Sequence, residues 1–145
     1  MSDKPKCKNH GIDQDLFDTL LTAFDNMPAG QHLGVEVRYL GHGKSCVTML
    51  AKNELGNTQG LLQGGIISAL CDHAMGTAAR TLGFWIVTLE MNINYLLKVP
   101  LGSLIVAEGS VVKCGKSIIV GEAHVYNDGE LVAKSRGTFY VTGTY

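Results

Sequence analysis

The segment from Asn57 to Leu82 constrains the fold more than any other part of the chain. After Gln63-Gly64-Gly65 it continues without proline, and its apolar residues recur at the spacing of a helix. A helix over about 65–82 would be apolar on nearly every side, so it must be buried with the other elements packed around it. Asp72 lies in its middle, where a carboxylate is seldom buried without a reason.

The helix face that carries Asp72 is made of small residues, against which another element or a ligand can lie: Gly65, Ser68, Ala69, Gly76 and Ala79. At the helix N-terminus, the N–H groups of Gly64 and Gly65 favour developing negative charge. Seven residues of helix rise roughly 10 Å, so one substrate carbon cannot easily lie beside Gly65 and Asp72 of the same copy. If the two cooperate, Gly65 of one subunit faces Asp72 of another across antiparallel helices. Alternatively, Asp72 is only hydrogen-bonded by a core Ser or Thr, or paired at a subunit interface.

Length and composition indicate a single globular domain. The chain has 145 residues, 46% hydrophobic and 17% charged, and a formal net charge of −1 without a Lys/Arg cluster, which argues against nucleic-acid binding. No apolar run has transmembrane length and the N-terminal segment is not a secretory signal, so we expect a cytoplasmic protein with no membrane partner. The four cysteines are far apart without a CxxC pair, and we predict no metal site.

The order of elements follows from the changes in periodicity. Residues 1–12 are expected to form a flexible tail, and residues 13–145 one domain. A helix is predicted at 13–26, ending before Pro28. Alternating patterns predict six strands, at 33–40, 45–51, 84–99, 103–114, 117–127 and 131–142. Six antiparallel strands around one apolar helix make an α+β domain.

The strand predicted at 84–99 carries a polar row, in which Thr88, Glu90, Asn92 and Asn94 alternate with apolar residues. Such a row is either a solvated face or part of a site. We expect a solvated face, with Thr88 as the exception.

Several motifs, in order and spread over about residues 33–142, resemble those of the hotdog-fold acyl-CoA thioesterases of the PaaI type. They are Asn57-x-x-Gly60-x-x-Gln63-Gly64-Gly65, Ala69-Leu70-x-Asp72-x-Ala74-x-Gly76-x-Ala78-Ala79, Thr88-x-Glu90-Met91-x-Ile93-x-Tyr95-Leu96, Gly115-Lys116, Asp128-Gly129-x-Leu131-Val132-Ala133 and Gly137-Thr138-Phe139. The resemblance implies a hotdog fold, an antiparallel sheet of about six strands wrapped around one long central helix.

The resemblance also implies a reaction, the hydrolysis of an acyl- or aryl-acyl-CoA thioester to a free acid and CoA. The N–H of Gly65 would polarise the thioester carbonyl, and Asp72 of the neighbouring subunit would act as general base or nucleophile. Asn57 and Thr88 would place the water and the carboxylate. No cofactor is required, and the expected assembly is a homodimer with composite sites, arranged as a tetramer of paired dimers.

Gln63 departs from the family pattern, in which many members have His before the two glycines. A glutamine donates a hydrogen bond but carries no proton near neutral pH, so we expect Gln63 to orient the loop or to contact the carbonyl. Gly64 and Ser68 would contact the substrate. Lys116, after Gly115, is the candidate for the CoA phosphates, or simply a solvated turn lysine. The small, apolar helix face suggests an aryl or medium-chain acyl group.

Two other functions compete with hydrolysis. A hotdog hydratase or dehydratase would use a His with a carboxylate on the helix, and here Gln63 and the lack of a well-placed His argue against it. A non-catalytic acyl-CoA-binding or sensing protein would keep the pocket without turnover, and Gln63 keeps this alternative open.

Overall fold

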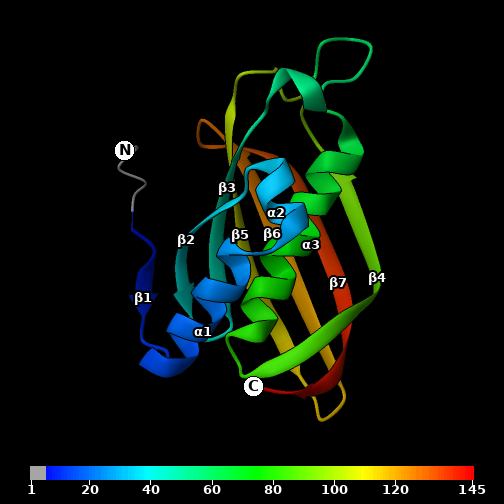
Figure 1. The fold of residues 1–145 in the computed structure, drawn as a ribbon. Coiled ribbons are helices and arrows are strands. Elements are labelled where there is room, and N and C mark those ends of the chain that lie inside the picture. The colour runs from blue at the N-terminus through cyan, green and yellow to red at the C-terminus, as the bar shows by residue number, and fades with distance from the viewer. Residues whose placement is uncertain (1–5) are drawn as a thin grey trace.

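The computed structural model describes residues 6–145, in which one long helix, α3 (Gly64–Arg80), lies across a face of a seven-stranded sheet (Figure 1). The strands are β1 (Lys8–His10), β2 (Glu36–Gly41), β3 (Lys44–Leu50), β4 (Phe84–Tyr95), β5 (Leu104–Cys114), β6 (Ile118–Asn127) and β7 (Glu130–Thr144), in the sheet order β1-β2-β3-β5-β6-β7-β4. The predicted α+β class, with a long central helix on an antiparallel sheet, is confirmed, with seven strands instead of about six.

The strand β4 lies at the edge of the sheet opposite to β1 (Figure 1). It pairs with β7 and not with β5, the next strand along the chain. The residues between β4 and β5 return the chain to β3, against which β5 pairs antiparallel. One side of β4 therefore has no strand beside it within the described chain.

The N-terminal region differs most from the predictions. The flexible tail expected over residues 1–12 is wrong for Lys8–His10, which form β1 parallel to β2, with the His10 ring stacked on Tyr39 at 4.4 Å. Residues 1–5 lie outside the described part of the chain. The helix predicted at 13–26 is α1 (Gln14–Asp25), capped by the Asp13 side chain. A short helix, α2 (Pro28–Leu33), follows where a strand was predicted to begin at residue 33.

Close contacts with the sheet hold α3 in place. The Ser45 hydroxyl on β3 donates a 2.7 Å hydrogen bond to the Ala74 carbonyl, and Gly109 on β5 lies under the same carbonyl. The helix ends at Arg80, two residues before the predicted end, with Thr81 as its C-cap. At 17 residues it is the longest helix among residues 6–145, and none of their helices has the length and apolar character needed to cross a membrane.

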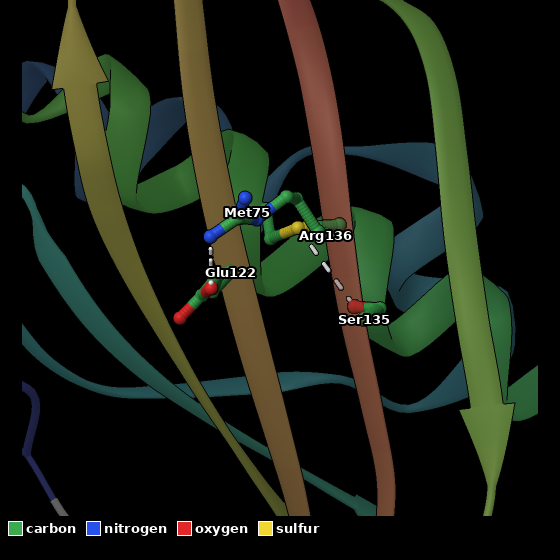
Figure 2. Close-up of polar contacts among 4 residues, drawn as sticks. All are labelled: Met75, Glu122, Ser135 and Arg136. Atoms are coloured by element: carbon green, nitrogen blue, oxygen red, sulfur yellow. Dashed lines mark hydrogen bonds and ion pairs between the residues drawn. The ribbon is translucent and has the colours of Figure 1, made fainter.

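Alternation along β7 separates the two faces of the sheet (Figure 2). Ser135 faces α3, where its hydroxyl lies 3.8 Å from the Met75 sulfur. The next residue, Arg136, donates a 2.7 Å hydrogen bond to Glu122 of β6 on the other face. The inner face is therefore the core, and the outer face carries charged pairs.

An irregularity in β4 changes the side of the sheet that one predicted site residue faces. The pairing with β7 shifts between Thr88 and Glu90, so that Thr88 opposes the buried Phe139 and Glu90 opposes Thr138. Because the shift adds one residue, Thr88 faces α3 whereas Glu90 lies on the outer face, where it accepts a hydrogen bond from Thr138. Thr88 therefore does not belong to the polar row in which the simple alternation placed it.

Candidate active site

A cavity of about 370 Å³ lies between α3, the α1–α2 segment and β4. A volume of this size is typical of sites for small ligands. The walls are mostly apolar, and the helix contributes a row of small or polar residues. The lining residues are Phe24, Met27, Ala29, Gly30, Leu33, Val35, Ala69, Asp72, His73, Gly76, Thr77, Arg80, Ile86, Val87, Thr88 and Phe139.

Asp72 and Thr88 meet at this cavity. The Thr88 hydroxyl donates a hydrogen bond of 2.7 Å to Oδ1 of Asp72, which is half-buried on α3. Within residues 6–145, Oδ2 of Asp72 accepts no hydrogen bond from a side chain or backbone group. Thr88 thus fixes the orientation of the carboxylate and leaves its second oxygen free to accept a proton from a water or a substrate.

The N-terminus of α3 lies at a second cavity of about 270 Å³, whose lining includes Asn57, Gly64, Ile67, Tyr95 and Lys98. The N–H groups of Gly64 and Gly65 belong to the first helical turn, where the helix supplies no acceptor. A methyl group added to Gly64 would lie 3.4 Å from the Tyr95 ring, so the backbone of Gly64 comes close to this aromatic side chain. The helix therefore begins with two N–H groups that have no acceptor within the helix, and Gly64, the first of the two residues, lines this cavity.

The other residues predicted near this end shape the backbone. Oε1 of Gln63 caps α3 by accepting a 3.2 Å hydrogen bond from the Ile66 N–H. Oδ1 of Asn57 accepts from the N–H groups of Gln59 and Leu61, which holds the preceding turn. The Ser68 hydroxyl donates to the Gly65 carbonyl at 2.9 Å, within the helix itself.

A single chain does not bring all the predicted residues together. Asp72 and Thr88 line the first cavity, whereas Asn57 and Gly64 line the second. Seven helical residues, about 10 Å of rise, separate Gly65 from Asp72. Gly115 and exposed Lys116 lie in the β5–β6 turn, the hairpin at the bottom of Figure 1, and line neither cavity.

Two lining residues of the first cavity, His73 and Arg80, were not among the predicted site residues. His73 packs edge-on against Phe24 with a centroid distance of 5.9 Å, and burial together with the Arg80 charge lowers its pKa to about 4. Arg80 follows Asp72 by eight residues, with Gly76 between them. That spacing puts the three residues on one helix face, and it was the signal in the sequence that could have identified Arg80.

The partly buried His73 makes the stability of the protein depend on pH. Its pKa is lowered from 6.5 to about 4 in the folded chain, mainly by burial. Between these values the unfolded chain binds a proton that the folded chain does not, so the free energy of unfolding decreases as the pH falls through this window. We expect the loss to reach roughly 3 kcal/mol once the window has been crossed.

Urea unfolding at pH 7 and at pH 4 measures this effect. In His73→Leu no proton can bind at residue 73. The decrease in the free energy of unfolding from pH 7 to pH 4 is therefore expected to be roughly 3 kcal/mol smaller in this variant than in the wild type. His42→Leu, at an exposed turn position, is the matched control and should keep the wild-type dependence. If stability depended equally on pH in His73→Leu and in the wild type, protonation of His73 would not be its cause.

Comparison with known proteins identifies the family. Residues 59–134 match the family model of the thioesterase superfamily. The chain belongs to this superfamily. This thioesterase is 36% identical over 115 residues to a protein of Saccharolobus solfataricus provisionally named an esterase, covering 77% of this chain and 81% of that protein. It is 32% identical over 100 residues to human acyl-coenzyme A thioesterase 13, covering 66% and 71% of the two chains.

Solved structures agree with this assignment. The E. coli PaaI protein shares the fold with a TM-score of 0.87 at 22% identity, over 92% of this chain and 98% of that one. A hypothetical thioesterase of Streptococcus pneumoniae, solved with coenzyme A, has a TM-score of 0.74 at 32% identity, over 76% and 90%. The predicted PaaI-type hotdog thioesterase is thereby confirmed, and the protein is a thioester hydrolase.

The Streptococcus pneumoniae thioesterase was also solved as two single variants, one Asp to Ala and one Thr to Ala. The two substituted residues of that protein are 16 positions apart, the same separation as between Asp72 and Thr88.

Proposed function

We propose that this thioesterase hydrolyses acyl-CoA thioesters, with Asp72 as the carboxylate that starts the chemistry. The observation that carries the proposal is the Thr88–Asp72 hydrogen bond at the wall of a cavity large enough for an acyl group. Asp72 either removes a proton from the attacking water or attacks the carbonyl itself. In the first route water adds to the carbonyl, the carbon–sulfur bond breaks, and the proton taken by Asp72 passes to the sulfur, giving the free acid and the CoA thiol. In the second route the carbon–sulfur bond breaks as an anhydride forms between the acyl group and Asp72. A water then hydrolyses this anhydride, which releases the free acid, restores Asp72 and supplies the proton for the CoA thiol.

The N–H groups of Gly64 and Gly65 are the proposed donors to the thioester oxygen, which becomes negative during attack. Donors of this kind contribute on the order of 3 kcal/mol to lowering a barrier. Gln63 supports them indirectly, because its side chain caps the same turn. In this role it needs no titratable proton, so the absence of a histidine at this position is compatible with catalysis.

A second copy of the chain completes the proposed site. The free edge of β4 exposes large apolar side chains, with Val87 50% and Leu89 56% exposed, and an uncovered apolar edge strand is a typical pairing surface. Antiparallel pairing of two β4 strands places two α3 helices antiparallel and side by side. Each Asp72 then approaches the first turn of the partner's helix, as the separation of Gly65 and Asp72 within one chain requires.

The reaction is tested by following thiol release from a panel of aryl and aliphatic acyl-CoA esters. We expect saturable turnover of at least one ester, and the ranking of kcat/KM identifies the acyl class. Saturable binding of the esters without turnover of any member would refute hydrolysis and favour an acyl-CoA-binding protein.

The composite site is tested with heterodimers of two inactive variants. Asp72→Asn removes the base. Gly65→Pro removes one N–H donor in the first helical turn, where proline fits the backbone, and its Cβ also displaces the flexible Gln63 side chain, whose Oε1 would lie 2.8 Å away. Each homodimer should be inactive, whereas a heterodimer purified through two different tags contains one intact site and should show about half of the wild-type activity. A heterodimer as inactive as its parents would show that the two residues do not act across subunits.

A further inference from the structure

The first cavity ends at an arginine. Asp72, Gly76 and Arg80 follow one another at four-residue spacing on α3, and all three line the cavity. Their spacing covers about 12 Å of helix rise, with no side chain on Gly76 to interrupt the path. An acyl group whose carbonyl lies at Asp72 is therefore directed along this face towards Arg80.

Arg80 has no carboxylate within ion-pair distance among residues 6–145. Its guanidinium lies 5.5 Å from the Trp85 ring centroid and 6.0 Å from that of Phe24, so its charge is held between two aromatic rings. Burial lowers the pKa of the neighbouring His73, which is neutral at pH 7. Arg80 is consequently the one cation among the residues that line this cavity.

A second donor without an acceptor lies nearby. Tyr145 stacks on Trp85 at 4.3 Å, and its buried hydroxyl lies against Arg80 but has no acceptor of its own within the described chain. Burial raises the pKa of Tyr145, whereas the charge of Arg80 and a hydrogen bond from it act in the opposite direction, and the hydroxyl stays protonated. Buried donors are normally paired. Tyr145 does not line the cavity, and as a neutral group it does not cancel the positive charge that Arg80 brings to the cavity wall.

We propose that Arg80 selects acyl groups that carry an oxygen acceptor, a carboxylate or a phenolic hydroxyl, at the end far from the thioester carbonyl. This inference rests on the proposed acyl-CoA hydrolysis at Asp72. Because a helical arginine leans towards the N-terminus, the space between the two groups suits roughly one aromatic ring or a five- or six-carbon chain. The intervening walls are apolar, formed by residues such as Met27, Ile86 and Phe139.

Matched pairs of substrates test this role. We compare kcat/KM for adipyl-CoA with hexanoyl-CoA, and for 4-hydroxybenzoyl-CoA with benzoyl-CoA. In the wild type, the oxygenated member of at least one pair is expected to be preferred by about tenfold or more, since a site built to hydrogen-bond a polar group discriminates strongly. Arg80→Met, which keeps an apolar stem beside Phe24 and Trp85, should reduce that preference to within about twofold.

Control variants separate selectivity from structure. Arg136→Met removes an arginine that is paired with Glu122 on the outer face of the sheet (Figure 2), and it should leave both preferences unchanged. Arg80→Lys keeps the charge and should retain part of the preference for adipyl-CoA. Three results would overturn the proposal. The wild type could show no difference in kcat/KM within either pair, or the difference could survive in Arg80→Met. Arg80→Met could also lower kcat/KM equally for both members of each pair.

A binding measurement distinguishes failure of this inference from failure of the proposed reaction. Calorimetry measures the affinities of Asp72→Asn for adipyl-CoA and hexanoyl-CoA, because this variant does not turn the esters over. The same two affinities are then measured for the double variant Asp72→Asn, Arg80→Met. Tighter binding of adipyl-CoA that is lost with Arg80 supports the selectivity even if no ester is hydrolysed. Equal affinities of Asp72→Asn for the two esters overturn the proposed selectivity, whether or not the wild type hydrolyses acyl-CoA.

Discussion

The substitution Asp72→Asn is expected to lower kcat/KM for acyl-CoA hydrolysis by about a thousandfold. Asparagine has nearly the same shape and still accepts the hydrogen bond that Thr88 donates, so the cavity and the fold should be preserved. The amide cannot take a proton from water and is a poor nucleophile, so either chemical role of Asp72 is removed. Thiol release under single-turnover and steady-state conditions measures the loss.

The control for this substitution is Asp128→Asn, in the β6–β7 turn. Asp128 has a φ of 51°, a left-handed conformation that asparagine also adopts readily, and it lies outside both cavities. This variant should retain wild-type kcat/KM. If Asp72→Asn also retained it while remaining folded, a carboxylate at residue 72 would not be needed, and the proposed reaction would have to start from another group.

Thr88→Val separates orientation from chemistry. Valine keeps the shape of threonine but leaves Oδ1 of Asp72 without its donor. A hydrogen bond to a charged group contributes about 1.5–3 kcal/mol, so kcat should fall about ten- to a hundredfold, less than in Asp72→Asn. The effect belongs in kcat, because the base remains present but is no longer held in place.

The central helix and its carboxylate could be predicted from the sequence because both depend on local pattern. An apolar helix of this length has no alternative to burial, and the rise per residue alone separates Gly65 from Asp72. The structure agrees, since the two ends of α3 line different cavities. The partnership of Thr88 with Asp72 was predicted from the family resemblance, and the hydrogen bond supplies its physical basis.

Strand β1 and the side of the sheet that Thr88 faces were missed because they depend on contacts distant in sequence, whereas helix α2 and Arg80 had local signals that were not used. Simple alternation placed Thr88 on the same side as Glu90, and only the shifted pairing with β7 turns it towards α3. Strand β1 is three residues long and exists because it pairs with β2, which no local pattern reveals. Helix α2 begins with Pro28 and has Gly34 as its C-cap, but Pro28 was interpreted as the end of the preceding helix and Gly34 as part of a strand over 33–40. Arg80 was not among the predicted site residues.

The second large effect is expected for Gly109→Ala, which should destabilise the fold by about 3 kcal/mol or more. A methyl group at Gly109 would collide with the Ala74 carbonyl oxygen and would lie 2.8 Å from the Ser45 hydroxyl oxygen. The first contact is with helix backbone, so α3 would have to move away from β5. Because α3 carries Asp72 two residues before Ala74, the same shift would also disturb the Asp72–Thr88 hydrogen bond.

Urea unfolding distinguishes this contact from a general intolerance of β-strands to substitution at glycine. Gly143→Ala makes the same change in β7, where the nearest atom, on Trp85, is at an ordinary 3.8 Å, and should leave the midpoint nearly unchanged. The double variant Ser45→Ala with Gly109→Ala removes the hydroxyl but not the helix carbonyl, so it should not recover stability. Recovery in the double variant would mean that the Ser45 side chain, and not the backbone of α3, sets the limit at Gly109. The distance between α3 and β5 could then vary at this contact. Other contacts of α3 with the sheet would have to hold Asp72 in the orientation in which it accepts the hydrogen bond from Thr88.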